Sequence, residues 1–136
     1  MSVVRAILKG VTQKSAATMA DAEDPRLRGR TYAIPFDRVW NDALALASGG
    51  LRGWRVLNAD DHEGVINALA TGSVFRVTAS VTIRIVLDEN AQTRVDARAE
   101  NVSGRADLGT CVRQLHRFFR ALDGAVAANG PRANGR

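Results

Sequence analysis

Cysteine, histidine and aromatic residues are scarce in this sequence, and each shortage argues against a class of function. The chain has 136 residues, with one cysteine, Cys111, and two histidines. A single cysteine forms no internal disulfide, so nothing in the composition favours an oxidising compartment. Two histidines, one of them in an expected turn, leave no credible Ser-His-Asp arrangement. Aromatic residues make up 5% of the chain and lie mainly on apolar faces, which argues against a platform that stacks nucleic-acid bases.

Long apolar segments and nucleotide-binding motifs are missing too. The longest apolar runs fall far short of the roughly 20 residues that span a membrane. The opening MSVVRAILKG lacks the apolar region and the cleavage site of a secretory signal. The sequence has no phosphate-loop and no dinucleotide fingerprint. We therefore expect a soluble, cytoplasmic protein of one domain, with no cofactor and no metal.

The positive charge is concentrated at the two ends of the chain. The net charge is +5, to which residues 1–30 contribute +3, residues 31–110 contribute −2 and residues 111–136 contribute +4. Basic ends of this kind can meet an anionic membrane surface, an acidic protein or nucleic acid. Nucleic acid is the least favoured of the three, because the aromatic platform is missing.

Residues 1–30 are predicted to form an arm followed by a linker. Near the start of this arm, apolar residues recur at helical spacing and two cations lie between them; the stretch comprises Val3, Val4, Arg5, Ile7, Leu8, Lys9 and Val11. It is about three turns long, which is marginal for an isolated helix. Residues 12–30 are polar and lack periodicity, and residues 128–136 read as a polar tail. The compact domain is therefore expected at 31–127.

The domain is expected to open with a short strand and an amphipathic helix. TYAI at 31–34 is the candidate strand. Pro35 suits the first turn of a helix, where its missing N–H is not needed. The helix at 35–48 then repeats apolar residues every three or four positions, namely Phe36, Val39, Trp40, Ala43, Leu44 and Ala47. The glycines of GGLRG end it.

Four strands and a long helix follow. The strands are expected at 53–59, 65–71, 75–87 and 93–101, joined by short polar turns. The third is the clearest because apolar and polar residues alternate along it. Its inward residues are Phe75, Val77, Ala79, Val81, Ile83, Ile85 and Leu87. The last helix carries one broad apolar stripe of Leu108, Cys111, Val112, Leu115, Phe118, Phe119, Leu122 and Val126.

These elements predict an α+β fold. We expect a two-layer sandwich, in which a mainly antiparallel sheet of four to five strands packs two amphipathic helices on one face. The other face is polar, and it is either solvated or an interface. Its expected residues are Arg76, Arg84, Arg94, Asp96, Arg98 and Glu100.

Three polar clusters could carry chemistry, and each has a simpler explanation. DDHEG at 60–64 offers metal ligands, but consecutive residues in a tight turn rarely converge on one ion, so a polar hairpin is favoured. Cys111 and His116 could pair as nucleophile and base, but they project differently from a helix, so a buried structural cysteine is favoured. The last cluster is an arginine stripe on the final helix, which could contact phosphate but is better explained as a solvated face. It comprises Arg113, Arg117 and Arg120.

The segment VDARAENVSGRADLG at 95–109 leads from the last strand into the last helix. Ser103 or Asp107 can cap that helix, and Gly104 permits a sharp turn. Arg105 lies beside the helix N-terminus, where free N–H groups favour anions. Capping is the favoured interpretation. The alternative is an anion or partner site formed by Arg98, Gly104, Arg105 and Asp107.

This segment, together with TCVRQLHRFFRAL after it, resembles the bacterial domain of unknown function 1499 family. Members carry a Val-Asp-x-Arg-Ser strand, a Val-Gly-Arg-Ser-Asp-x-Gly turn and an Asn-x-x-Arg-Ile helix. The matching positions here are Val95, Asp96, Arg98, Gly104, Arg105, Asp107, Gly109 and Arg113. GWRV and VINA also resemble the family's first hairpin, so the resemblance covers roughly residues 30–126. Motif serines and the helix asparagine are replaced here, by Ala99, Ala106 and Cys111 among others. The resemblance implies the fold and no activity.

The functional expectation rests on two features: candidate catalytic groups do not converge, and an apolar, basic arm precedes a compact domain. We expect a non-catalytic accessory subunit docked through its arm on a larger assembly. A membrane bioenergetic complex, respiratory or photosynthetic, is the candidate host, with the protein on the cytoplasmic face. The alternative is a small-ligand or anion-binding domain that uses Arg98 and Arg105 in the cleft between helix and sheet.

Overall fold

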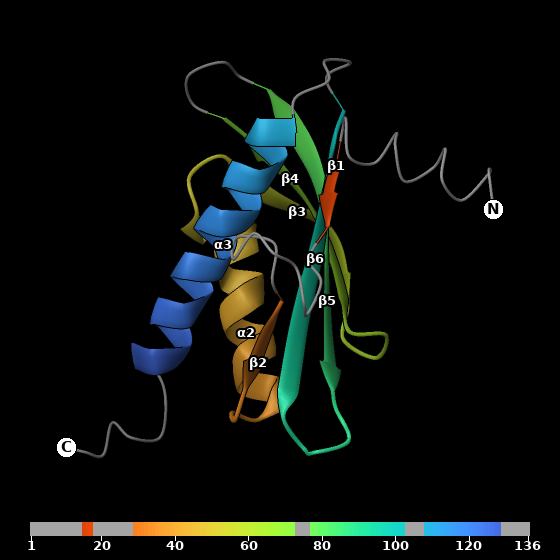
Figure 1. Ribbon diagram of the computed structural model, residues 1–136, viewed down its shortest axis with the longest axis vertical. Helices are drawn as coiled ribbons and strands as arrows, with labels where there is room; N and C mark the ends of the chain where they lie inside the picture. Colours follow the sequence, from red (N-terminus) through yellow and green to blue (C-terminus); the bar gives the residue numbers. More distant parts are fainter. Residues whose placement is uncertain (1–14, 18–28, 73–76, 103–107, 129–136) are drawn as a thin grey trace.

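The computed structural model describes residues 15–17, 29–72, 77–102 and 108–128. Their order along the chain is strands, helix, strands and helix (Figure 1). The elements are β1 (Ser15–Ala17), β2 (Arg30–Tyr32), α2 (Phe36–Ala45) with its π-helical end η2 (Leu46–Gly50), β3 (Trp54–Asp60), β4 (Val65–Thr71), β5 (Thr78–Leu87), β6 (Thr93–Asn101) and α3 (Leu108–Ala128). The predicted strand near 31–34, the two helices and the four later strands are confirmed.

All the strands belong to one antiparallel sheet in the order β1-β6-β5-β4-β3, with β2 also paired to β6. β1 and β2 share the same edge of β6, because Ala16 lies opposite Ala99 and Thr31 lies opposite Arg94. Strand β1 falls inside the stretch expected to be a linker, so that expectation was wrong at Ser15–Ala17. A three-residue strand has too few residues to show a period of two.

The helices form one layer and the sheet forms the other. In Figure 1, α2 and α3 both lie on the same side of the sheet, which confirms the predicted two-layer α+β sandwich. The alternation on β5 follows the prediction at Val77, Val81 and Ile83, which are 0–3% exposed. It fails at Leu87, which is 59% exposed because β5 ends there, beyond the cover of the helices. Phe75 lies outside the described residues.

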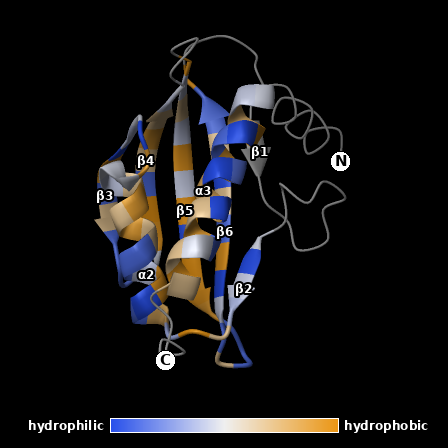
Figure 2. Ribbon diagram, turned by 90° about the vertical axis from the view of Figure 1, so that its left-hand side faces the viewer, coloured by the Kyte–Doolittle hydropathy of each residue, from blue (hydrophilic) through white to orange (hydrophobic). Residues whose placement is uncertain are grey.

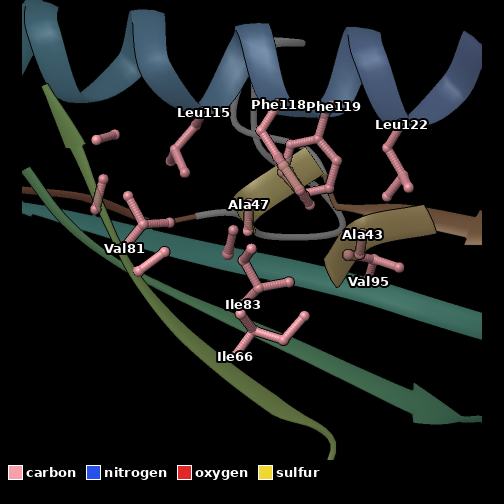
Figure 3. Close-up of a cluster of buried hydrophobic side chains, with 14 of the residues drawn as sticks. Ala43, Ala47, Ile66, Val81, Ile83, Val95, Leu115, Phe118, Phe119 and Leu122 are labelled. Atoms are coloured by element: carbon pink, nitrogen blue, oxygen red, sulfur yellow. The ribbon is translucent and has the colours of Figure 1, made fainter. Parts of the chain in front are cut away.

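The core fills the space between α3 and the inner face of the sheet. Figure 3 shows Phe118 and Phe119 of α3 directed toward Ile83 and Ile66 of the sheet, and these four side chains are fully buried. Trp54 stacks on Phe118 with ring centroids 5.5 Å apart, and Phe119 meets Phe118 edge-on at 5.2 Å. Burying each such side chain contributes about 1.5–3 kcal/mol.

Small residues leave room for these rings. The inner face of the sheet carries five fully or almost fully buried alanines, and α2 with η2 adds two more; they are Ala68, Ala70, Ala79, Ala97, Ala99, Ala43 and Ala47. Two helices can therefore pack close to the sheet without voids.

The glycines at turns fix how the strands meet. Gly64, in the turn between β3 and β4, has a φ of 71°, and its carbonyl accepts a hydrogen bond from the backbone N–H of Ile85 at 2.7 Å. A Cβ added at Gly64 would collide with the carbonyl oxygen of Ile85. We expect Gly64→Ala to lower the free energy of unfolding by about 2 kcal/mol or more, from strain and collision together.

Urea denaturation followed by tryptophan fluorescence measures this loss. Gly124→Ala is the matched control, because Gly124 lies in α3 and an added Cβ meets nothing within 4 Å. The control should raise stability by about 0.5–1 kcal/mol. Equal stabilities for the two variants would contradict the described turn.

Candidate functional site

The outer face of the sheet carries polar side chains, and neither of the two described helices lies on it. Both helices pack on the inner face, and no described element lies across the outer one (Figure 1). Alternating burial along β4, β5 and β6 assigns side chains to this face. We call it the open face and define it by Arg55, Asn58, Asn67, Thr82, Arg84, Asp96, Arg98 and Glu100.

A row of polar side chains crosses four strands of the open face. Asn67 Nδ2 donates to Asn58 Oδ1 at 2.8 Å, and Thr82 Oγ1 donates to Asn67 Oδ1 at 3.0 Å. Arg98 lies directly opposite Thr82 on the next strand, at the end of this row. The side chains of Asn58, Asn67 and Thr82 are therefore held in place before any partner arrives.

A bulge in β3 makes the row possible. The pairing of β3 with β4 shifts between Val56 and Asn58, which brings Asn58 opposite Asn67. Leu57 is the extra residue, and its side chain is 50% exposed. A bulge on an edge strand also disturbs the unpaired backbone groups that would otherwise attract another strand.

Charges of both signs alternate on the rest of the open face. Arg94 donates to the two carboxylate oxygens of Asp96 at 2.8 and 2.9 Å. Arg84 lies opposite Asp96 on the neighbouring strand, and Glu100 follows Arg98 by two residues along β6. The face therefore offers donors and acceptors in a fixed pattern, with no large field of one sign.

Only one of the residues predicted for the anion site falls within the described part of the chain. Arg98 is exposed on the open face, while its neighbours Ala97 and Ala99 are buried beneath the helices. Its side chain therefore faces away from the cleft between helix and sheet in which the hypothesis placed it. Gly104, Arg105 and Asp107 lie outside the described residues, and anion binding at this corner stays a prediction.

The residues of the N-terminal arm also lie outside the described residues. These are Val3, Val4, Arg5, Ile7, Leu8, Lys9 and Val11. Their predicted role in partner binding is therefore carried forward as a proposal.

The acidic turn at 60–64 and the buried cysteine have the simpler roles expected of them. Asp60 Oδ1 accepts the backbone N–H groups of His62 and Glu63 at 3.0 and 3.2 Å, so the acidic turn is a hairpin closed by its own side chain. Within the described residues, no three metal-ligating side chains gather. Cys111 is fully buried in the core, as predicted, and His116 is half-buried on the same helix.

Hydrogen bonds between β2 and α3, which the sequence pattern did not indicate, form a clasp that joins the sheet edge to the helix. Tyr32 donates its hydroxyl hydrogen bond to Asp123 Oδ1 at 2.6 Å, and Arg30 Nε donates to the same carboxylate at 3.2 Å. The Arg30 guanidinium also lies over the ring of Phe119, 5.1 Å from its centre. The only signal in the sequence was that Asp123 is the single acidic residue of the last helix.

A second polar link joins β3 to α3. Gln114 is 4% exposed, and its Oε1 accepts hydrogen bonds from Trp54 Nε1 at 3.1 Å and from Arg117 Nη1 at 3.0 Å. Arg117 Nη2 also reaches the backbone carbonyl of Arg52 at 3.5 Å. Gln114 lies within the predicted apolar stripe of the helix, and a lone buried glutamine gives no pattern from which to predict its partners.

The comparison with protein families finds one match across most of the chain. The family is described as a protein of unknown function (DUF1499), and its model matches residues 9–122. The search of curated proteins gives no match. The match extends the resemblance seen in the sequence to residues before 30, and so it includes strand β1.

The clasp gives a pH dependence that can be read from one chromophore. Burial raises the pKa of Tyr32 well above its ordinary value of 10.0, and the hydrogen bond to Asp123 and its negative charge raise it further. The folded state therefore holds this proton more tightly than the unfolded state. The contribution of Tyr32 to stability is complete below pH 10 and declines as the pH rises above it.

Tyr32 is the only tyrosine in the chain, so ultraviolet absorbance of tyrosinate reports it alone. We expect no tyrosinate signal at pH 10–11 while the protein stays folded. Asp123→Asn should lower the pKa of Tyr32 toward 10. In Tyr32→Phe no hydroxyl is left to ionise at this position, so the decline in the free energy of unfolding that Tyr32 causes above pH 10 should disappear. A tyrosinate signal with a midpoint near pH 10 in the folded wild type would contradict the clasp.

Proposed function

The chain belongs to DUF1499, a family of proteins of unknown function, and we propose that it is a non-catalytic accessory subunit. It docks on a larger protein assembly through the apolar and basic stretch of its N-terminal arm, residues 3–11, and through the open face. The observation that carries the proposal is the open face itself. It is the outer surface of the sheet, which no described element covers, and hydrogen bonds already fix the side chains of Asn58, Asn67 and Thr82 on it.

Preorganisation supports docking at this surface. Binding normally costs about 0.5–1.5 kcal/mol for each rotamer-rich side chain that it immobilises. Asn58, Asn67 and Thr82 are already held by one another in the free protein. A partner that meets this row therefore loses less free energy to side-chain ordering than it would on a loose polar surface.

The mixed charge of the open face indicates the chemistry of the partner. Arg84 and Arg98 lie among Asp96 and Glu100, so a polyanion would meet repulsion as well as attraction. A folded protein surface can place an acid opposite each arginine and a base opposite each carboxylate. Such complementarity gives specificity rather than bulk affinity. We therefore propose a protein partner at this face.

The internal roles of the reactive side chains support a non-catalytic function. Cys111 has no exposed surface. Asp123 accepts hydrogen bonds from Tyr32 and Arg30. These side chains link the helix layer to the sheet, and this structural role supports the proposal.

The host assembly that we propose is membrane-embedded, with a respiratory or photosynthetic complex as the candidate. The support is the amphipathic stretch of the arm, where five apolar residues at helical spacing accompany Arg5 and Lys9. Segments of this pattern bind grooves on proteins or the edge of a membrane. We place the chain at the cytoplasmic periphery of that assembly, with this stretch as its attachment. No described helix is long and apolar enough to cross a membrane.

Charge reversal on the open face tests this proposal. The full chain is purified from its own host in mild detergent, and stoichiometric partners are identified by mass spectrometry. We expect a defined protein complex with the wild type, and at least about a tenfold loss of it for Arg84→Glu/Arg98→Glu, because each new carboxylate faces an acid of the partner. Deleting residues 2–12 should release the protein as well.

The matched control is Arg113→Glu/Arg120→Glu, which makes the same charge change on the exposed side of α3. This variant should retain the complex. The complex is isolated in detergent, so a contact between α3 and a lipid bilayer would not contribute to the result. A wild-type protein that purifies alone, or equal loss from the two double variants, would overturn docking at the open face.

A further inference from the structure

The exposed side of α3 carries a row of three arginines. Arg113 and Arg120 are exposed, and Arg117 lies between them, half-buried. The three residues fall on one side of the helix within about 10 Å along its axis. Arg52 adjoins them, because Arg117 reaches its backbone carbonyl. We call these four residues the basic row. Figure 2 looks onto this helix layer.

The middle of the basic row is fixed by the core. Arg117 donates to Gln114, and Gln114 in turn accepts from Trp54 in the stacked aromatic cluster. An anion that binds Arg117 therefore finds its guanidinium already oriented. Arg117 therefore differs from a loose surface cation, whose side chain would have to be ordered on binding.

The stretch of α3 that carries the three arginines is positively charged. The sequence has no Asp or Glu between residues 108 and 122. The first acid of α3, Asp123, is already occupied by Arg30 and Tyr32. The open face on the other side of the sheet, by contrast, mixes both signs.

We propose that the basic row binds the headgroups of an anionic phospholipid bilayer. Three arginines on one side of an amphipathic helix, with Arg52 next to them in the fold, resemble the basic clusters that bind anionic lipid. Nucleic acid fits less well, because Trp54, Phe118 and Phe119 are buried and cannot stack on bases. This inference goes beyond the proposed function, since it concerns the opposite face and a lipid instead of a protein.

The arm adds a second reason to choose a bilayer. Its sequence combines Val3, Ile7, Leu8 and Val11 with two cations, a pattern typical of segments that lie in a membrane surface. Stable attachment usually needs two weak signals acting together. The basic row would supply one and the arm the other.

Sedimentation with sucrose-loaded vesicles tests the proposal with the full chain. Vesicles of 30% phosphatidylglycerol in phosphatidylcholine are compared with pure phosphatidylcholine at about 0.1 M salt. We expect binding to the anionic vesicles, weakened by added salt. The Arg113→Gln/Arg120→Gln variant should bind on the order of twentyfold more weakly, or about fivefold for each arginine.

The matched control is Arg55→Gln/Arg84→Gln on the open face, which removes the same charge and should bind these vesicles within about twofold of the wild type. Circular dichroism establishes that both variants are folded. Equal binding to neutral and anionic vesicles, or equal losses from both variants, would overturn the proposal. The proposal would also be overturned if the protein bound a duplex DNA or an RNA probe more tightly than the anionic vesicles and only the Arg113→Gln/Arg120→Gln variant lost that binding. None of these results depends on capture of a protein partner.

Discussion

The packing of Phe118 and Phe119 against the inner face of the sheet is the interaction on which the rest of the structure depends. Those two rings fill the space left by the alanines of β4, β5 and β6, and Trp54 extends the aromatic cluster to the edge strand. The cluster packs α3 against one face of the sheet, and α2 packs beside α3 on the same face. The chain offers no third described helix, so one sheet face is buried and the other is left to water or to a partner. The open face is thus a consequence of how the core is built.

Two polar links hold the edges of the sheet to the helix layer. Gln114 ties α3 to β3 through Trp54, and Asp123 ties α3 to β2 through Tyr32 and Arg30. The second link matters for function because β2 and β1 connect the N-terminal arm to β6. A force on the arm would therefore act on the sheet edge and on the clasp at Asp123. The chain that follows the arm is thus anchored to the fold by part-buried hydrogen bonds and an ion pair.

Most of the fold could be predicted from the sequence because its elements follow strong periods. The alternation on β5 and the apolar stripe of α3 give the strand, the helix and the face that each buries. Strand β1 could not be predicted, since Ser15–Ala17 has no period and gains its structure only by pairing with β6. The two polar links could not be predicted either, because Tyr32 and Asp123 are 91 residues apart. The polar row needed the bulge at Leu57, and no local pattern marks which residue of an edge strand is extra.

The central claim is that the open face meets a protein partner, and site-specific photo-crosslinking in the native host tests it most directly. A benzoylphenylalanine residue would replace Arg84 on the open face or, as a comparison, Asn41 on the exposed side of α2. Both positions are exposed, so reactivity with solvent and with passing molecules is similar. The account predicts one adduct of defined mass from the Arg84 position, with one protein, and none from the Asn41 position. Adducts with the same protein from both positions, or from the Asn41 position alone, would contradict it.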